Sequence, residues 1–396
     1  MEGSRQTLVV RPVQTERDRM AFIRFPFRLY TDDPCWVPPL LYERKAFFNP
    51  KKNPFYRHAE VELYLAERGG EVVGTISAHI NYNHNAFHNE KVGFFGFFEV
   101  IEDYQVAQAL LDAACEWVRA RGMTAIRGPM NFSTNEECGL LVDGFDSPPV
   151  VFMTYNPRYY QGFLERYGMQ KAMDLWAYRL DIETVGTDLG KLPPKLKRVV
   201  NMALERGRFT IRNANIRDFE NELARLKRIY NSAWERNWGF VPMTDEEIDH
   251  LARGIKRWID PDLIFVAEVD GEPVGVSITL PDMNQPLLHM GGKLFPFGWL
   301  KYLWYRRKMH ICRVFAMGVL EAYRGQGIDA VFYYLTGKAA IPKGYTMAEM
   351  SWILETNTMM NRAVRFLGGQ VYKTYRIYEK GLVPLEAGPT SSQLLG

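Results

Sequence analysis

The stretch Arg313–Ala330, which reads Arg-Val-Phe-Ala-Met-Gly-Val-Leu-Glu-Ala-Tyr-Arg-Gly-Gln-Gly-Ile-Asp-Ala, decides the fold of this chain. The apolar run Val314–Leu320 predicts a strand, and an apolar helical pattern begins at Ala330. The loop between them contains Gly325 and Gly327, which allow backbone N–H groups to turn toward a bound anion. Because the helix that follows adds the positive end of its dipole, the stretch predicts a phosphate-binding loop.

Composition narrows the class of protein. The chain has 396 residues, 47% of them hydrophobic, which suffices for two domains or one large domain. The formal net charge of +3 is close to balance and gives no support to a nucleic-acid partner. The sequence has neither an apolar run long enough to span a bilayer nor the apolar core of a signal peptide. Its four widely spaced cysteines favour a reducing compartment, so we expect a cytoplasmic protein that binds no metal and no nucleic acid.

Two halves of the chain repeat one pattern. Glu67–Gly74 and Glu268–Gly275 share E-x-x-G-E-x-V-G between apolar strands, and both predict hairpins turned at glycines. Each hairpin is followed by a strand, a helix, a strand, a helix ending near glycine and an aromatic strand. We expect these last strands, Leu175–Leu180 and Val371–Tyr378, each to close its own half. The shared order indicates duplication, with a first domain over 1–182, a connector with a short basic helix over 183–208 and a second domain over 209–396.

This arrangement resembles the GNAT superfamily of acyl-CoA-dependent acyltransferases. The segment Arg324–Asp329 matches the family's pyrophosphate loop, Q/R-x-x-G-x-G/A, except that Asp329 replaces the last glycine or alanine. We expect Asp329 to cap the following helix. A helix containing Asn361-Arg-Ala363 supplies a second family element. The resemblance implies an α/β protein of mixed sheets with two tandem GNAT-like domains.

The resemblance also implies where acyl-CoA binds. In this family the pantetheine arm bonds to a strand that is splayed from its neighbour. The expected acyl-CoA-binding residues are Ala316, Met317, Gly318, Val319, Arg324, Gly325, Gln326, Gly327, Ile328, Asp329, Ala330 and Asn361. The first half has Glu99–Ala107 at the equivalent place, with no glycine and three acids that would repel a diphosphate. We therefore expect one cofactor site, with the first copy either degenerate or forming one wall of the acceptor site.

The reaction requires a group that accepts a proton, because an attacking amine must arrive neutral. Glu349 and Glu355 are six residues apart around one predicted strand and so share a face. Glu355 stands beside Asn357 at the strand's end, where GNAT acceptor sites open. These three are the expected catalytic residues, and a surface or helix-capping role for either glutamate is an equally good interpretation.

Further candidates come from the last strand and from a loop of the first half. Many GNAT enzymes protonate the leaving thiolate with a tyrosine, and Phe366 occupies the matching position here. Tyr372 or Tyr375 would then substitute for it. The loop Gly128–Gly139 follows a strand where GNAT active sites face their cleft, and Glu136 is among its polar residues. A turn-rich structural loop is the alternative interpretation.

The segment Lys293–Lys308 suggests the acceptor. It mixes aromatic residues and leucines with five cations between two core strands. Such a mixture suits the headgroup boundary of a bilayer, and an amphipathic core helix is the alternative. Contact through this segment would place the protein in the cytoplasm, peripheral to the inner membrane, with a hydrophobic or lipid amine as acceptor.

Three functions remain open at this point. The whole-chain arrangement also resembles the bacterial ceramide synthases, GNAT-like proteins that acylate a sphingoid base from acyl-CoA. This resemblance implies sphingoid-base N-acylation as the sharpest hypothesis. A small-molecule or peptide N-acetyltransferase is the first alternative. A non-catalytic module that binds acyl-CoA is the second, since Asp329 and Phe366 depart from the active pattern.

Overall fold

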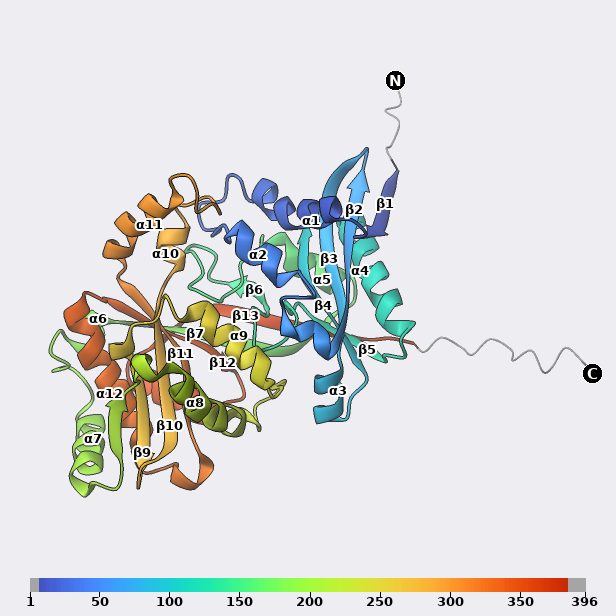
Figure 1. The fold of residues 1–396 in the computed structure, drawn as a ribbon. Coiled ribbons are helices and arrows are strands. Elements are labelled where there is room, and N and C mark those ends of the chain that lie inside the picture. The colour runs from blue at the N-terminus through green and yellow to red at the C-terminus, as the bar shows by residue number, and fades with distance from the viewer. Residues whose placement is uncertain (1–6, 384–396) are drawn as a thin grey trace, which may run out of the picture.

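One mixed sheet runs through the whole molecule. In the computed structural model, which describes residues 7–383, thirteen strands join in the order β1-β2-β3-β4-β5-β13-β7-β12-β11-β10-β9-β8, with β6 beside β13 (Figure 1). The strands are β1 (Leu8–Pro12), β2 (Ala59–Arg68), β3 (Glu71–Asn81), β4 (Val92–Val100), β5 (Ala125–Gly128), β6 (Leu140–Asp143), β7 (Gln170–Asp181), β8 (Thr210–Asn213), β9 (Ile264–Val269), β10 (Glu272–Pro281), β11 (Ile311–Val319), β12 (Met347–Leu354) and β13 (Gln370–Gly381). The α/β class with mixed sheets is confirmed.

Helices cover both faces of this sheet. They are α1 (Glu16–Leu29), α2 (Leu41–Phe47), α3 (Tyr82–His88), α4 (Tyr104–Arg119), α5 (Tyr159–Arg166), α6 (Ile182–Val185), α7 (Pro194–Arg206), α8 (Phe219–Trp234), α9 (Asp245–Ile255), α10 (Asn284–Leu287), α11 (Gly298–Tyr305), α12 (Ile328–Ala340) and α13 (Thr358–Phe366). In residues 7–383 no helix is both long and apolar enough to cross a membrane. The basic helix expected after the prolines is α7, with Pro194 in its first turn.

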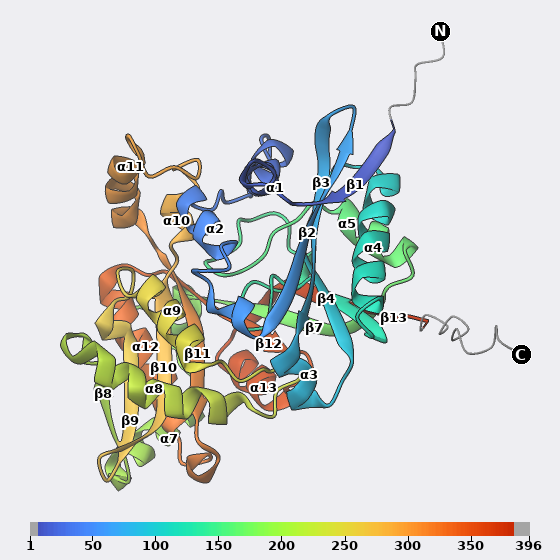
Figure 2. The same cartoon turned by 45° about the vertical axis from the view of Figure 1, so that its right-hand side comes forward.

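The repeated order of elements is confirmed in both halves. The hairpins β2–β3 and β9–β10 are antiparallel. In the first half α4 connects β4 to a parallel β5, and in the second α12 connects β11 to a parallel β12. Figure 2 shows the two sets of strands side by side, with α4 against the first and α8 and α9 in front of the second.

The closing strands differ from the expectation. β7, from the first half, pairs with β12 of the second half, and β13, from the second half, pairs with β5 of the first. β7 and β13 also pair with each other along most of their length. Each half is thus closed by the other half's last strand, and cross-strand side-chain contacts between β7 and β13 stabilise this central pair.

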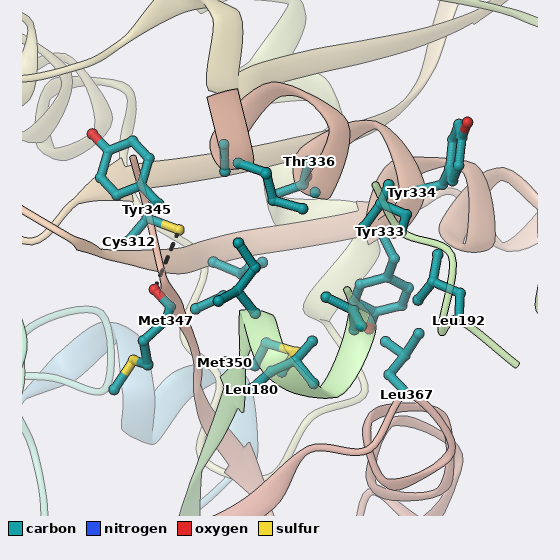
Figure 3. A pocket seen from close by; sticks show the side chains of 18 of the residues that line it. Leu180, Leu192, Cys312, Tyr333, Tyr334, Thr336, Tyr345, Met347, Met350 and Leu367 are labelled. Carbon is teal, nitrogen blue, oxygen red and sulfur yellow. Dashed lines mark hydrogen bonds between the residues drawn. The ribbon is translucent and has the colours of Figure 1, made fainter. Parts of the chain in front are cut away.

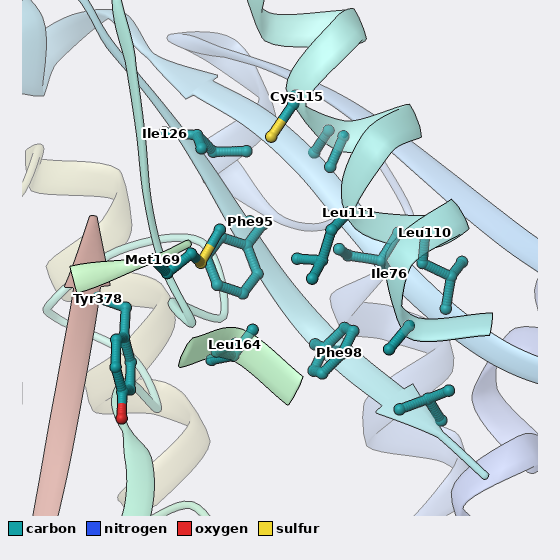
Figure 4. Close-up of a cluster of buried hydrophobic side chains, with 14 of the residues drawn as sticks. Ile76, Phe95, Phe98, Leu110, Leu111, Cys115, Ile126, Leu164, Met169 and Tyr378 are labelled. Carbon is teal, nitrogen blue, oxygen red and sulfur yellow. The ribbon is translucent and has the colours of Figure 1, made fainter. Parts of the chain in front are cut away.

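The exchanged strand β13 contributes a side chain to the hydrophobic core of the first half. Figure 4 shows the first-half core, where Leu110 and Leu111 of α4 pack near Phe95 of β4. Tyr378 of β13 lies in the same cluster and is 1% exposed. The C-terminal strand therefore supplies part of the first half's hydrophobic core, and the two halves depend on each other for stability.

Candidate active site

The splayed strands expected for a cofactor are β11 and β12. They pair in parallel only from Ile311–Met347 to Val314–Met350, although both strands continue beyond. At that point β11 bulges: Thr279 pairs with Val314 and Ile278 pairs with Ala316, so Phe315 is the extra residue. The strands separate just at Ala316–Val319, which are the residues expected to face the pantetheine arm.

The expected phosphate loop has the backbone of an anion cradle. Gly325 and Gly327 have φ of 75° and 87°, which glycine adopts without strain. Within the described residues, no N–H group from Gly325 to Ala330 donates a hydrogen bond. These free donors surround the first turn of α12, so the loop fits a diphosphate.

Asp329 does not cap the helix. The N-cap residue of α12 is Gly327, and Asp329 lies within the first turn. The expectation failed because the glycine already turns the chain two residues earlier. A carboxylate in a first helical turn still interacts favourably with the helix dipole.

Two neighbours hold the loop in place. The Arg324 guanidinium donates to the carbonyls of Val319 and Ala233, at 3.1 and 3.0 Å. On the opposite side α7 packs so closely that a Cβ on Gly327 would lie 3.0 Å from the Cβ of Ala203. Lys195 and Arg206 share the Ala203 face of α7 and are exposed, so cations flank the cradle.

The residues expected after β12 have structural partners. Glu355 accepts hydrogen bonds from the Lys171 ammonium and the Asp174 backbone N–H, at 2.7 and 3.1 Å. Asn357 is the N-cap of α13. Asn361 is buried, accepts from the Tyr178 hydroxyl and donates to the Leu354 carbonyl, both at 3.0 Å. These contacts place all three at the base of α13, and their roles in catalysis or cofactor binding stay a prediction.

Glu349 lies closer to the bulge. It is 0% exposed and is the cross-strand partner of Arg313, whose guanidinium lies 5.5 Å from the Phe315 ring centre. The hydroxyls of Ser351 and Tyr372 both donate to its carboxylate. Burial raises the pKa of Glu349, while Arg313 opposes that rise.

Glu349 and its partners show which expected residues the structure brings together. Of the two tyrosines offered in place of Phe366, Tyr372 bonds Glu349, whereas the Tyr375 hydroxyl is buried without a partner. The sequence pattern missed Arg313, although it begins the decisive stretch. An arginine inside an apolar strand was the signal that could have revealed this buried cluster.

The loop Gly128–Gly139 lies on the seam between the halves. Thr134 donates to the Gly239 carbonyl at 2.8 Å, and Asn135 accepts from the Tyr230 hydroxyl of α8 at 3.2 Å. Glu136 next to them is half-buried. Burial raises the pKa of Glu136 to about 8, and the neighbouring Glu137 adds to the rise.

These features define a tandem GNAT protein, and the comparisons agree. Residues 25–128 match the model of the Acetyltransferase (GNAT) family. A tandem GNAT protein from the clavulanic acid biosynthesis pathway has the same fold, with a TM-score of 0.58 at 12% identity over 96% of this chain and 100% of that one. A GCN5-related N-acetyltransferase from Sphaerobacter thermophilus gives a TM-score of 0.52 at 14% identity, over 94% of this chain and 95% of that one.

Two relatives align along almost their whole length. The chain is 39% identical to the bacterial ceramide synthase of Caulobacter vibrioides (strain NA1000 / CB15N), over 96% of this chain and 99% of that protein. It is 37% identical to protein YghO of Escherichia coli (strain K12), over 94% of this chain and 95% of that protein. The chain therefore belongs to the GNAT family of N-acyltransferases, in its tandem form, a family that uses acyl-CoA as co-substrate.

The family model matches the first half of the chain. It covers the first half, where the phosphate loop is missing, and not the second half that carries the loop. The first half therefore retains the family's general pattern without its glycines. Among residues 7–383 no group of three or more His, Cys, Asp or Glu side chains is placed to hold a metal ion.

Proposed function

We propose that this protein transfers the acyl group of acyl-CoA to the amine of a lipid-like acceptor, most specifically to a sphingoid base. The observation that carries this proposal is the 39% identity to a protein named bacterial ceramide synthase, which extends over 99% of that protein. Because no large part of either chain is left unmatched, the acceptor site and the donor site are both covered by the similarity.

The donor would lie along β11. Its diphosphate oxygens would accept hydrogen bonds from the free N–H groups at the start of α12, and Lys195 and Arg206 of α7 would add positive charge. The pantetheine arm would follow Ala316–Val319 in the opening between β11 and β12. The thioester carbonyl would then sit at the Phe315 bulge, where backbone N–H groups can polarise it.

Glu136 is the proposed proton acceptor. It lies on the seam beside Tyr230, which lines a cavity together with Phe315 and Ala316. Glu349 is completely buried, whereas Glu136 is half-buried and keeps part of its side chain at the surface. A pKa of about 8 also brings Glu136 closer to the pKa of an ammonium ion, so that above this pH its carboxylate can take a proton from the acceptor.

Tyr372 is the proposed proton donor to the leaving thiolate. Its hydroxyl donates a hydrogen bond to the Glu349 carboxylate, which orients the hydroxyl, and the tyrosinate left after the transfer regains its proton from water once CoA has left. The amine nitrogen forms its bond to the carbonyl carbon, the tetrahedral intermediate collapses, and the carbon–sulfur bond breaks. One proton passes to Glu136 and one reaches the thiolate, so the amide and free CoA leave without a covalent enzyme intermediate.

The lipid acceptor is supported by the surface of α11. Phe297 and Trp304 are 68% and 61% exposed, and Lys301, Arg306, Arg307 and Lys308 are exposed beside them. Figure 1 shows α11 at the periphery of the second half, away from the sheet. Tyr302 packs against the small apolar cluster around Leu287, while Gly298 is the one buried residue of α11. We propose that Lys293–Lys308 contacts anionic lipid, which would place the protein peripheral to the inner membrane on its cytoplasmic side.

A turnover assay tests the function. Purified protein is mixed with palmitoyl-CoA and a long-chain amino alcohol, and both free thiol and amide product are followed. We expect thiol release that depends on the amine. Faster turnover with acetyl-CoA and a hydrophilic amine would favour a small-molecule N-acetyltransferase. Binding of acyl-CoA without release under any condition would contradict the proposed reaction.

A further inference from the structure

A partly open apolar cavity lies against the face of the second-half sheet that α8 and α9 cover. It has a volume of about 90 Å³ and is enclosed between α8, α9 and the strands β9, β10 and β11. Its walls are built almost entirely from alanine, isoleucine, leucine, valine, methionine and phenylalanine side chains. The two-carbon group of acetyl-CoA would end at the thioester and leave this space empty.

The cavity begins where the thioester would lie. Phe315 and Ala316, the two residues of the β11 bulge, are part of its wall. From there it crosses the sheet along one row of cross-strand partners, from Ala316 to Ile278 and then to Ile264. Ala214 continues the row, since its N–H bonds the Ile264 carbonyl. Three strand spacings of about 4.8 Å give this row a length of roughly 14 Å.

Its two polar lining residues have partners. Glu222 is paired with Arg212 at 2.9 Å and also with Arg225, and the Tyr230 hydroxyl donates to Asn135. No buried side-chain nitrogen or oxygen of the described cavity wall lacks a hydrogen bond. A space without free donors or acceptors recognises an aliphatic group and nothing polar.

We infer that this cavity holds the aliphatic tail of the acyl donor, so the protein selects medium- and long-chain acyl-CoA. The inference rests on the proposed function, because it uses the thioester position at the bulge. The carbons next to the thioester carbonyl must enter whichever space opens beside Phe315 and Ala316. The acceptor amine approaches instead from the seam at Glu136.

A second apolar cavity is the natural rival. It has a volume of about 80 Å³ and lies on the opposite face, between α12, the connector and β7 (Figure 3). Val314 and Met350, in its wall, belong to the last pair before the strands separate, so it faces the closed part of the sheet. The Thr336 hydroxyl in its wall is buried without a partner, which disfavours an alkyl chain there.

Binding of a donor series to the full chain tests the inference. CoA, acetyl-CoA, octanoyl-CoA, dodecanoyl-CoA and palmitoyl-CoA are titrated by calorimetry. We expect affinity to rise about fourfold for each methylene that enters the cavity. Equal affinity for acetyl-CoA and palmitoyl-CoA would overturn the inference while leaving an N-acyltransferase intact. No binding of any of the five would instead refute the donor site itself.

Two matched alanine substitutions locate the tail. Ala214→Phe fills the far end of the proposed cavity, and Ala340→Phe fills the rival cavity. The two alanines are similarly buried, at 8% and 6% exposure. We expect Ala214→Phe to lower the affinity for palmitoyl-CoA about tenfold or more and that for octanoyl-CoA less than twofold. Ala340→Phe should leave the affinities of the whole series unchanged. The opposite pattern, or no change with either variant, would overturn the inference.

Hydrogen exchange on the unmodified protein supplies a measurement that needs no variant. Palmitoyl-CoA should protect α8 and α9 beyond the protection that CoA alone gives. Protection limited to α12 and the connector would contradict the inference. A second assay asks whether the acceptor chain occupies the cavity instead. The rate is measured with amines of different chain length at one fixed donor. Ala214→Phe should leave the dependence of the rate on amine length unchanged, and a changed dependence would assign the cavity to the acceptor.

Discussion

The side-chain oxygen of Asn131 accepts a hydrogen bond from the backbone N–H of Phe97 at 2.8 Å. Phe97 lies at the register shift of β4, the first-half counterpart of the β11 bulge. The loop here is packed so closely that a Cβ on Gly96 would lie 1.8 Å from the Met130 carbonyl oxygen. In the first half, the loop residues Met130 and Asn131 therefore occupy the opening beside β4. In the second half, the corresponding opening beside β11 is available to a ligand.

This difference predicts one CoA site per chain. Calorimetric titration should give a stoichiometry of one, and Gly327→Glu should abolish binding because it puts charge and bulk into the cradle. Gly344→Glu is the matched control: its φ of 88° imposes similar backbone strain, but nothing lies within 4 Å of its Cβ. Two sites in the unmodified protein, or equal loss in both variants, would refute this assignment.

A base at Glu136 predicts a specific pH dependence. Because its pKa is raised to about 8, Glu136 is protonated below that pH and becomes a base above it. The rate at saturating donor should therefore rise as the pH increases through about 8. Glu136→Gln should remove this limb and lower kcat by about 100-fold with CoA affinity unchanged.

The exposed Glu220 on α8 provides the control for that experiment. Glu220→Gln changes the net charge equally and should leave the pH profile intact. An unaltered profile in Glu136→Gln would remove this residue from the mechanism.

The two tyrosines of β13 predict opposite results. Tyr372→Phe removes a hydroxyl that donates to Glu349, so we expect kcat to fall about 10- to 100-fold with little change in donor affinity. Tyr375→Phe removes a buried hydroxyl without a partner and should leave kcat unchanged and stability equal or higher. Equal kcat values in the two variants would rule out Tyr372 as the proton donor.

The sequence predicted the local chemistry well and the long-range pairing poorly. The glycines at 325 and 327 and the flanking apolar periods determine a strand, a cradle and a helix from local preferences alone. Which strand lies beside β5 or β12 depends instead on contacts between residues more than 150 positions apart, such as Tyr378 beside Gly128. No local pattern distinguishes a last strand that stays in its own half from one that is exchanged.

In the candidate site, too, single residues could be predicted from local sequence, whereas their partners could not. Glu349 was among the candidates because its position on a strand can be read from periodicity. Its partners Arg313 and Tyr372 come from other strands, and Glu136 comes from the other half of the chain. The strand's end made Glu355 the more attractive candidate, yet its ion pair with Lys171 becomes visible only once β7 lies beside β12.

The exchanged strands predict one unfolding transition for the whole chain. Leu110→Ala creates a cavity in the first-half core and should destabilise the protein by about 2–4 kcal/mol. Calorimetry should then show a single peak that moves as a whole, since Tyr378 couples that core to the second half's last strand. Two separable peaks, only one of which moves, would show that the halves fold independently.

The surface of α11 predicts binding to anionic vesicles. A double variant with Phe297→Ser and Trp304→Ser should lower binding to vesicles rich in phosphatidylglycerol about tenfold, because both rings are largely exposed. Met359→Ser is the control, since this residue is 79% exposed on a different helix. Equal co-sedimentation of the unmodified protein, the double variant and Met359→Ser would show that α11 does not contact lipid.

The most direct test of the account follows thiol release from palmitoyl-CoA and identifies the product by mass spectrometry, with and without a long-chain amino alcohol. We predict amine-dependent release with one amide formed for each thiol, and loss of both in Gly327→Glu. Release that does not depend on the amine, or palmitoyl-CoA binding that never leads to an amide, would contradict the assignment as a lipid N-acyltransferase.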